Sequence, residues 1–130
     1  MKIVVVNNLA FATHSNDQEI IISQLYPSAS DLLIVNASIS PLGSTTFNLD
    51  GTTTTIPPMT KDEILAVMTP EELAASELAT AGITNTTITL ALAAQSIDSE
   101  STEMAELSKQ VKKIAKKHKL SVTQVMGALK

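Results

Sequence analysis

Charged residues divide this chain of 130 residues into two segments of opposite sign. Residues 1–108 hold all 13 acidic residues but only two lysines, so this segment carries a net charge of −11. Residues 109–130 hold seven lysines and no acidic residue, which gives a net charge of +7. This segregation is typical of a basic end that contacts a polyanion or an acidic protein surface. Any fold of the chain must therefore leave the basic end exposed or place it over acidic side chains.

The composition indicates what kind of core the protein has and which kinds of binding site and reaction it lacks. The length fits one domain with a single core. That core must be aliphatic, because Phe11, Tyr26 and Phe47 are the only aromatic residues. So few aromatic side chains argue against recognition of single-stranded nucleic acid or sugars, which depends on stacking. The absence of cysteine excludes disulfides, thiolate metal sites and cysteine nucleophiles.

The N-terminal run KIVVV, residues 2–6, predicts a buried strand rather than part of a signal peptide. Asn7 and Asn8 split the apolar stretch into two pieces, each too short for the apolar region of a signal peptide. No run in the chain approaches the roughly 20 apolar residues that span a bilayer. We therefore expect no membrane partner and a cytoplasmic location.

Helix caps and a turn signal indicate the elements that follow. Strands are expected at residues 2–6, 31–40 and 83–93, with Ile83 and Ile88 of the last strand packing inward. Paired helix caps stand at Asn16 with Glu19, Thr60 with Glu63, and Thr69 with Glu72. We expect Pro27 to end the first of these helices and Gly82 to end the third.

Residues 44–56 predict a β-hairpin. Two alternating runs flank Asp50–Gly51, a pair that favours a two-residue turn of type I′. Pairing outward from that turn places Phe47 opposite Thr54 and Thr45 opposite Ile56. Together the elements predict an α+β (mixed α/β) fold: a small sheet with a β-hairpin covered by helices, plus a C-terminal helical pair. The expected organisation is an acidic α/β domain (1–94), a linker (95–102) and a basic helical tail (103–130).

Nothing in the sequence points to catalysis. The segment NLDGT, residues 48–52, resembles the DxDGT motif of haloacid-dehalogenase-type phosphatases, but Asn48 stands where that family has its nucleophilic aspartate. His14 and His118 are far apart and neither has the spacing of a metal-binding pair. The four glycines are not clustered, so no phosphate-binding loop is present. We expect a non-enzymatic protein without a metal or cofactor.

Two helices are expected at the basic end. The first begins near Thr102, and the second begins at Ser121, where Gln124 completes a capping box. The apolar residues of the first helix follow a 3-4-3 spacing that forms one stripe: Met104, Leu107, Val111 and Ile114. Lysines cover much of the rest of its surface.

A helix, a short break and a capped second helix resemble the helix-turn-helix DNA-binding motif over about 20 residues. The resemblance implies phosphate contacts from the first helix and the turn, and major-groove contacts from the start of the second helix, where Gln124 would pair with adenine. The residues so implied are Lys109, Lys112, Lys113, Lys116, Lys117, Lys119, Ser121, Thr123 and Gln124. Lys119 stands where this family usually has glycine, and the chain has no arginine, the commonest reader of guanine.

The same segment has a second interpretation. Its apolar stripe could dock on the acidic domain or form a homodimer seam, and glutamates at the start with lysines at the end suit the helix dipole without any partner. Two functions therefore remain open. One is a non-enzymatic binding protein whose partner is double-stranded DNA. The other is an interaction or assembly protein whose basic tail self-associates or binds an acidic protein partner.

Overall fold

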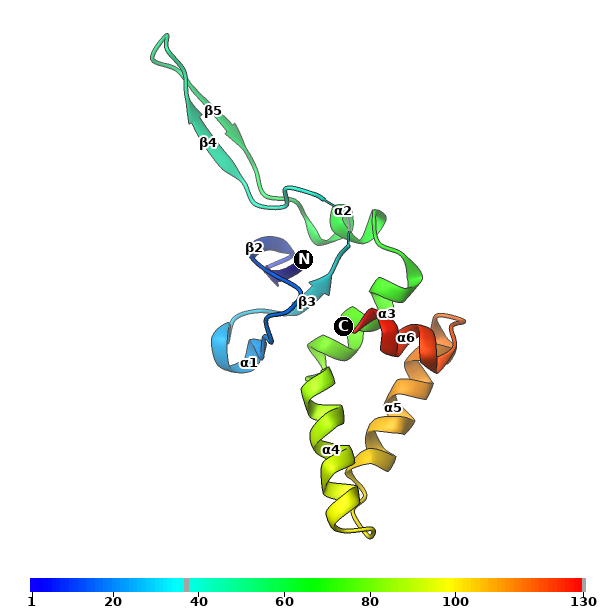
Figure 1. Cartoon of the computed structure of the whole chain (residues 1–130). Coiled ribbons are helices and arrows are strands. Elements are labelled where there is room, and N and C mark those ends of the chain that lie inside the picture. The colour runs from blue at the N-terminus through cyan, green and yellow to red at the C-terminus, as the bar shows by residue number, and fades with distance from the viewer. Residues whose placement is uncertain (37, 130) are drawn as a thin grey trace.

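The computed structural model describes residues 1–36 and 38–129 and has an α+β fold, as the sequence predicts (Figure 1). A small antiparallel sheet and a separate hairpin are followed by a helical part of the chain. In chain order, the elements are β1 (Lys2–Val6), β2 (Leu9–His14), α1 (Ile22–Leu25), β3 (Asp31–Ile34), β4 (Ser44–Phe47), β5 (Thr53–Ile56), α2 (Lys61–Ala66), α3 (Pro70–Thr80), α4 (Asn85–Ile97), α5 (Glu103–Lys117) and α6 (Val122–Ala128).

The sheet has the order β2-β1-β3, so the predicted N-terminal strand is confirmed as its centre. Asn7 and Asn8 reverse the chain between β1 and β2 with φ angles of 53° and 63°. Positive φ at both central residues is the requirement of a type I′ hairpin turn, and asparagine is one of the few residues that adopts it readily. The asparagine pair is thus the turn that creates β2, a strand that was not predicted.

The capping box predicted at Asn16 is wrong. The Asn16 side chain instead accepts a hydrogen bond from the amino terminus of Met1. Glu19, its expected partner, accepts a 2.8 Å hydrogen bond from the Thr84 hydroxyl. The helix expected here is reduced to the four residues of α1, because both capping side chains are committed to other elements.

The strand predicted over residues 31–40 is confirmed only as β3, Asp31–Ile34. Val35 extends the buried run by one residue and its N–H donates to the Met1 carbonyl at 2.8 Å. Residue 37, within the predicted strand, lies outside the described residues.

The hairpin forms where it was predicted, but with a register one residue away from the expected one. Phe47 pairs with Thr53, not Thr54. The Asn48 N–H donates to the Thr52 carbonyl at 2.9 Å, so three residues rather than two lie in the loop inside this pair. Of the residues in this loop, only Gly51 has a positive φ, 86°, so the type I′ requirement is not met. A turn closed by Gly51 N–H on the Asn48 carbonyl at 3.2 Å, followed by the left-handed glycine, gives the three-residue loop instead.

The strand predicted over residues 83–93 is wrong, because this segment begins α4. Thr84 and Thr87 form a reciprocal capping box that starts the helix. Ile83 and Ile88 are both buried, as expected, but five residues apart they could not share one face of a strand. Ile88 and Ala91, three residues apart, form the buried side of the helix. Residues 95–97, at the start of the predicted linker, are its last turn.

The capping signals at Thr60 and Thr69 are confirmed. Both residues form reciprocal capping boxes with the glutamate three positions on, and they start α2 and α3. Gly82, with φ 84°, ends α3 in the predicted left-handed conformation. Its N–H donates to the Ala79 carbonyl and that of Ile83 to the Leu78 carbonyl, the two bonds of a Schellman motif.

A ladder of side-chain hydrogen bonds joins α3 to the outer edge of β3. The bonds run from the backbone N–H groups of Leu32, Ile34 and Asn36 to the side-chain oxygens of Thr80 (3.0 Å), Ser76 (2.8 Å) and Glu72 (2.5 Å), respectively. Four residues of helix advance about 6.0 Å and two residues of strand about 6.7 Å, so the three contacts stay in register. The helix thus occupies the edge of the sheet that another strand would otherwise use.

Glu72 is an ionised side chain at the buried end of this ladder, with only 4% of its surface exposed. Burial is the largest influence on its pKa and raises it. Hydrogen bonds from the backbone N–H groups of Thr69 and Asn36 and from the Thr69 hydroxyl, with the charge of the Met1 ammonium, outweigh burial and lower the pKa overall. The carboxylate is therefore a charged acceptor in the folded protein.

Two apolar clusters cover the opposite faces of the sheet, because successive residues of β1 alternate between them. Ile3 and Val5 pack with Ile64 of α2 in the smaller cluster. Val4 packs in the larger cluster, which continues into α3, α5 and α6. The basic end therefore shares a core with the sheet.

We predict that Thr80→Val destabilises the protein by about 1–3 kcal/mol, because the Leu32 N–H loses its acceptor while the side-chain shape is kept. Urea unfolding would measure the change. Thr80→Ser retains the hydroxyl and should cost less than about 1 kcal/mol. Equal stability of Thr80→Val and the parent protein would contradict a structural role for the ladder.

Candidate nucleic-acid interface

Helix α5 separates its apolar and basic residues on opposite sides. Val111 and Ala115 are buried, and Met104, Leu107 and Ile114 of the predicted stripe pack against the same core. With about 100° of rotation per residue, the five lysines of the helix lie roughly 100° to 240° around from Val111. The lysines are therefore on the side that faces away from the core.

All six sequence-predicted lysines that precede α6 are exposed: Lys109, Lys112, Lys113, Lys116, Lys117 and Lys119. Lys117 pairs with Glu77 of α3 at 3.0 Å. Within residues 1–36 and 38–129, the other five have no carboxylate oxygen within ion-pair distance. Lys130, the last lysine, lies outside the described residues. Among its described residues, the structure thus brings together a set of cations without a carboxylate partner on one side of α5 and in the turn that follows.

Glu77 binds the end of α5 to α3. Its carboxylate oxygen Oε1 accepts from Lys117 Nζ at 3.0 Å and lies 2.9 Å from His118 Nε2. Burial has the largest influence on the pKa of Glu77 and raises it, but the hydrogen bonds and charges of Lys117 and His118 lower it overall. His118 is mostly buried, with a side-chain exposure of 16%, so it packs between the helices. The contact between Glu77 and His118 was not predicted from the sequence.

The turn between α5 and α6 is a Schellman motif built without glycine. The Leu120 N–H donates to the Ala115 carbonyl at 2.8 Å, and the Lys119 N–H donates to the Lys116 carbonyl at 3.2 Å. Lys119 has a φ of 58°, in the left-handed region. The turn therefore occurs at the predicted position, and a lysine adopts the conformation that glycine adopts with the least strain.

Helix α6 begins with the predicted capping box. The Ser121 hydroxyl accepts from the Gln124 N–H at 3.2 Å, and Gln124 Oε1 accepts from the Ser121 N–H at 2.9 Å. Ser121, Thr123 and Gln124 are all exposed. The capping bond uses the amide oxygen of Gln124, so the NH₂ group of the same side chain remains available as a hydrogen-bond donor.

The second helix is supported by the core rather than by α5 alone. Val125 is fully buried and Leu129 is 7% exposed, and both belong to the larger cluster. Helix α3 packs against both α5 and α6, which also pack against each other. These three helices form a bundle, so the exposed start of α6 and the lysines of α5 belong to one packed unit (Figure 1).

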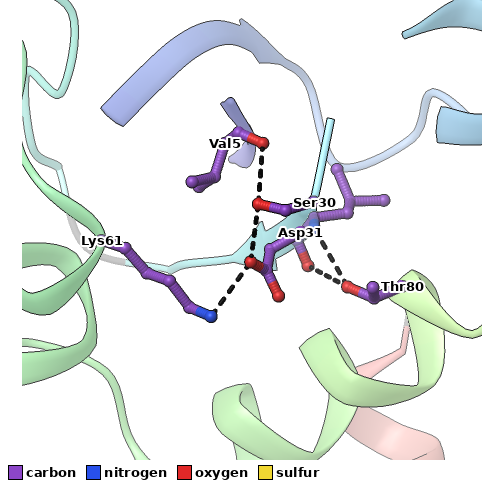
Figure 2. Close-up of polar contacts among 6 residues, drawn as sticks. Val5, Ser30, Asp31, Lys61 and Thr80 are labelled. Atoms are coloured by element: carbon purple, nitrogen blue, oxygen red, sulfur yellow. Dashed lines mark hydrogen bonds and ion pairs between the residues drawn. The ribbon is translucent and has the colours of Figure 1, made fainter. Parts of the chain in front are cut away.

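A groove of about 470 Å³ lies beside this bundle, between β3, α2, α3 and α5. Half of its lining residues are apolar: Leu33, Leu65, Leu73, Ala81 and Ile114. Asp31, which also lines it, pairs with Lys61 at 3.0 Å and accepts from the Ser30 hydroxyl at 3.0 Å (Figure 2). Thr80, another lining residue, is hydrogen-bonded to the Leu32 backbone. Asp31 and Lys61 thus pair with each other, whereas Ser76, Thr80 and Glu77 form their hydrogen bonds with residues outside the groove lining.

Two other kinds of feature are absent from the part of the chain that the structure describes. It holds no group of three or more histidines and carboxylates that could bind a metal ion. In that same part, none of the helices has the length and apolar character needed to cross a membrane. Comparison with known protein families, curated proteins and solved structures finds no match to this chain.

Lys119→Gly is expected to stabilise the protein by about 1 kcal/mol, because glycine adopts a positive φ without the strain of a Cβ atom. Denaturant unfolding would measure the gain. Lys119→Ala removes the same charge but keeps the Cβ atom, so it should give no comparable gain. If the alanine variant were stabilised as much as the glycine variant, charge repulsion rather than backbone strain would be the cause.

The Glu77 contact predicts a dependence of stability on pH. Because its pKa is lower in the folded than in the unfolded state, its contribution is present above the ordinary glutamate pKa of about 4.3 and is lost as the pH falls through the folded value. Since the side chain is 37% exposed, we expect less than about 1 kcal/mol. Glu77→Gln should be less stable at neutral pH, and the difference from the parent protein should vanish on acidification. A constant difference at every pH would contradict this assignment.

Proposed function

We propose that this protein binds double-stranded DNA, without catalysing a reaction on it, through the exposed lysines of α5 and the start of α6. The observation that carries the proposal is the set of five tail lysines that have no acidic partner within the described residues, next to an exposed helix start. Lysines on one side of a helix can each neutralise a phosphate and release its counterions, which gives affinity independent of sequence.

The order of the residues suits the two kinds of contact that DNA recognition requires. Lys112, Lys113 and Lys116 would lie along phosphates and set the position of the protein on the duplex. Ser121 and Thr123 would approach base edges, and the free NH₂ group of Gln124 could donate to a base or phosphate oxygen. Because Gln124 Oε1 already caps the helix, bidentate pairing with adenine would require the capping bond to open. We therefore expect affinity to depend mainly on phosphates, with modest sequence preference.

A second candidate is binding of an acidic protein surface by the same lysines. The contact of Glu77 with Lys117 and His118 supports it, because it is an example of this surface pairing with a helical carboxylate. DNA differs from an acidic protein in carrying a charge at regular intervals along its whole length, so the two partners predict different dependence on salt and on competitors.

We predict that a fluorescent duplex binds the protein at low salt and loses affinity steeply as salt rises, with a log–log slope of about −0.9 for each phosphate contacted. Replacing Lys112, Lys113 and Lys116 with glutamine should weaken binding to all duplexes and reduce the slope by about one for each phosphate that is no longer neutralised. Replacing the same three residues with arginine keeps the charge and serves as the matched control, so binding should be retained. Point variants are preferable to removal of residues 101–130, because α5 and α6 belong to the core.

Absence of duplex binding at low salt would reject the DNA proposal. Retained binding by the triple glutamine variant would reject the assigned site. Competition of the duplex by an acidic polypeptide at equal charge concentration, with no preference for DNA, would favour the acidic protein partner instead.

A further inference from the structure

The β4–β5 hairpin projects from the rest of the molecule, with both of its faces bare (Figure 1). Every residue of both strands is exposed, and Phe47 is 83% exposed. Among the described residues, neither strand packs extensively on any element other than its partner. An isolated two-stranded hairpin is only marginally stable in water, so this one calls for an additional contact.

The base of the hairpin is closed tightly. A Cβ atom on Gly43 would lie 2.7 Å from the Ile56 carbonyl oxygen and 2.9 Å from the Pro58 nitrogen, so the two chains are in close contact there. Just below, the Met59 N–H donates to the Pro41 carbonyl at 2.8 Å. The hairpin is therefore an arm with a defined attachment to the body.

Within residues 1–36 and 38–129, some backbone groups along the outer edge of β5 bond to no other strand. The Asn48 N–H donates to the Thr52 carbonyl at 2.9 Å, which marks this as a hydrogen-bonded pair. Because such pairs alternate along an antiparallel ladder, Thr54 bonds inward to β4, while the N–H and C=O groups of Thr53 and Thr55 point outward. These outward groups are available to another strand.

Lysine and proline, which often prevent pairing at the edge of a sheet, are missing from this arm. Residues 44–56 contain no lysine and no proline, and Asp50 in the loop is their only charged residue. The outer edge of β3 contrasts with this, because the side chains of α3 occupy it. A neutral, β-branched edge of this kind is suited to pairing with a second strand.

We propose that the arm joins two copies of this chain through antiparallel pairing of β5 with β5 of the second copy. A two-fold axis at Thr54 would place Thr53 opposite Thr55 of the second copy, so the outward groups of both strands would bond to each other. The threonine run 52–55 offers a similar edge in both directions, and threonine pairs across strands are favourable.

The arm offers two copies a contact that brings no like charges together. Residues 1–108 carry a net charge of −11, so contact between the acidic surfaces of two copies is disfavoured, whereas the arm brings one neutral edge against another. The arm contains no basic residue, which argues against nucleic acid as its partner. In Figure 1 the arm extends away from α5 and α6, so pairing of arms leaves the lysines free. The inference does not depend on the proposed function.

Proline substitution at one residue of each strand tests this pairing. Thr45 and Thr55 lie opposite each other with their hydroxyl oxygens 3.5 Å apart, so replacing either residue removes the same interaction within the hairpin. Both also have outward N–H groups, which proline removes without breaking the ladder. Only Thr55→Pro removes a donor from the proposed interface, so Thr45→Pro is the matched control.

Light scattering of the full chain over a range of concentrations would give the mass, and circular dichroism would verify that each variant is folded. We expect a dimer for the parent protein and for Thr45→Pro, and a monomer for Thr55→Pro. A parent protein that is monomeric at every concentration would overturn the proposal. A dimer that survives Thr55→Pro, or one that is lost equally in both variants, would overturn the assignment to the β5 edge.

Discussion

The hydrogen bonds that the edge of β3 donates to side chains of α3 align the helix on which α5 and α6 pack. A strand at the edge of a sheet has N–H groups that need partners, and α3 provides them with side chains spaced four residues apart. Once the helix is aligned along the strand, its other sides receive α5 and α6. The same alignment brings Glu77 to the end of α5. The arrangement of the basic surface thus depends on contacts that contain no lysine.

Local signals in the sequence were sufficient where a single residue determines the backbone. The caps at Thr60, Thr69 and Ser121 and the left-handed Gly82 are all found where they were predicted, because each acts within one turn of a helix. Errors arose where several local preferences compete. The β-branched residues of segment 83–93 favour a strand, but the Thr84 cap and the spacing of Ile88 and Ala91 favour the helix that forms.

Two further errors came from turns. The Asn7–Asn8 pair carried the signal for a hairpin, although it had been interpreted only as a break in the apolar run. At Asp50–Gly51 the position of the turn was correct, but no side chain on either face is buried to hold the register. The ladder of Glu72, Ser76 and Thr80 could have been suspected from polar residues at intervals of four in a helix rich in alanine.

The residues of the candidate interface could be predicted from the sequence, but the tertiary contacts that hold α5 and α6 in place could not. Helical spacing alone separates the lysines of α5 from its apolar stripe, and the structure agrees with that separation. The contacts of His118 and Lys117 with Glu77 join residues about 40 positions apart, and no local pattern encodes such a distance. The packing of α3 against α5 and α6 likewise joins segments that are distant in the sequence, so no local pattern predicts it.

The larger apolar cluster has a consequence for the order in which the protein can fold during synthesis. It combines Val4 of β1 with Val125 of α6 and with Leu129, which directly follows that helix. A ribosome releases the chain from its N-terminus, at about 5–20 residues per second, so this cluster stays incomplete until α6 has emerged. The smaller cluster, which needs nothing beyond Met68, can form on the other face of the sheet much earlier. During synthesis, one face of β1 can therefore be covered before α6, which completes the cluster on the opposite face, has emerged.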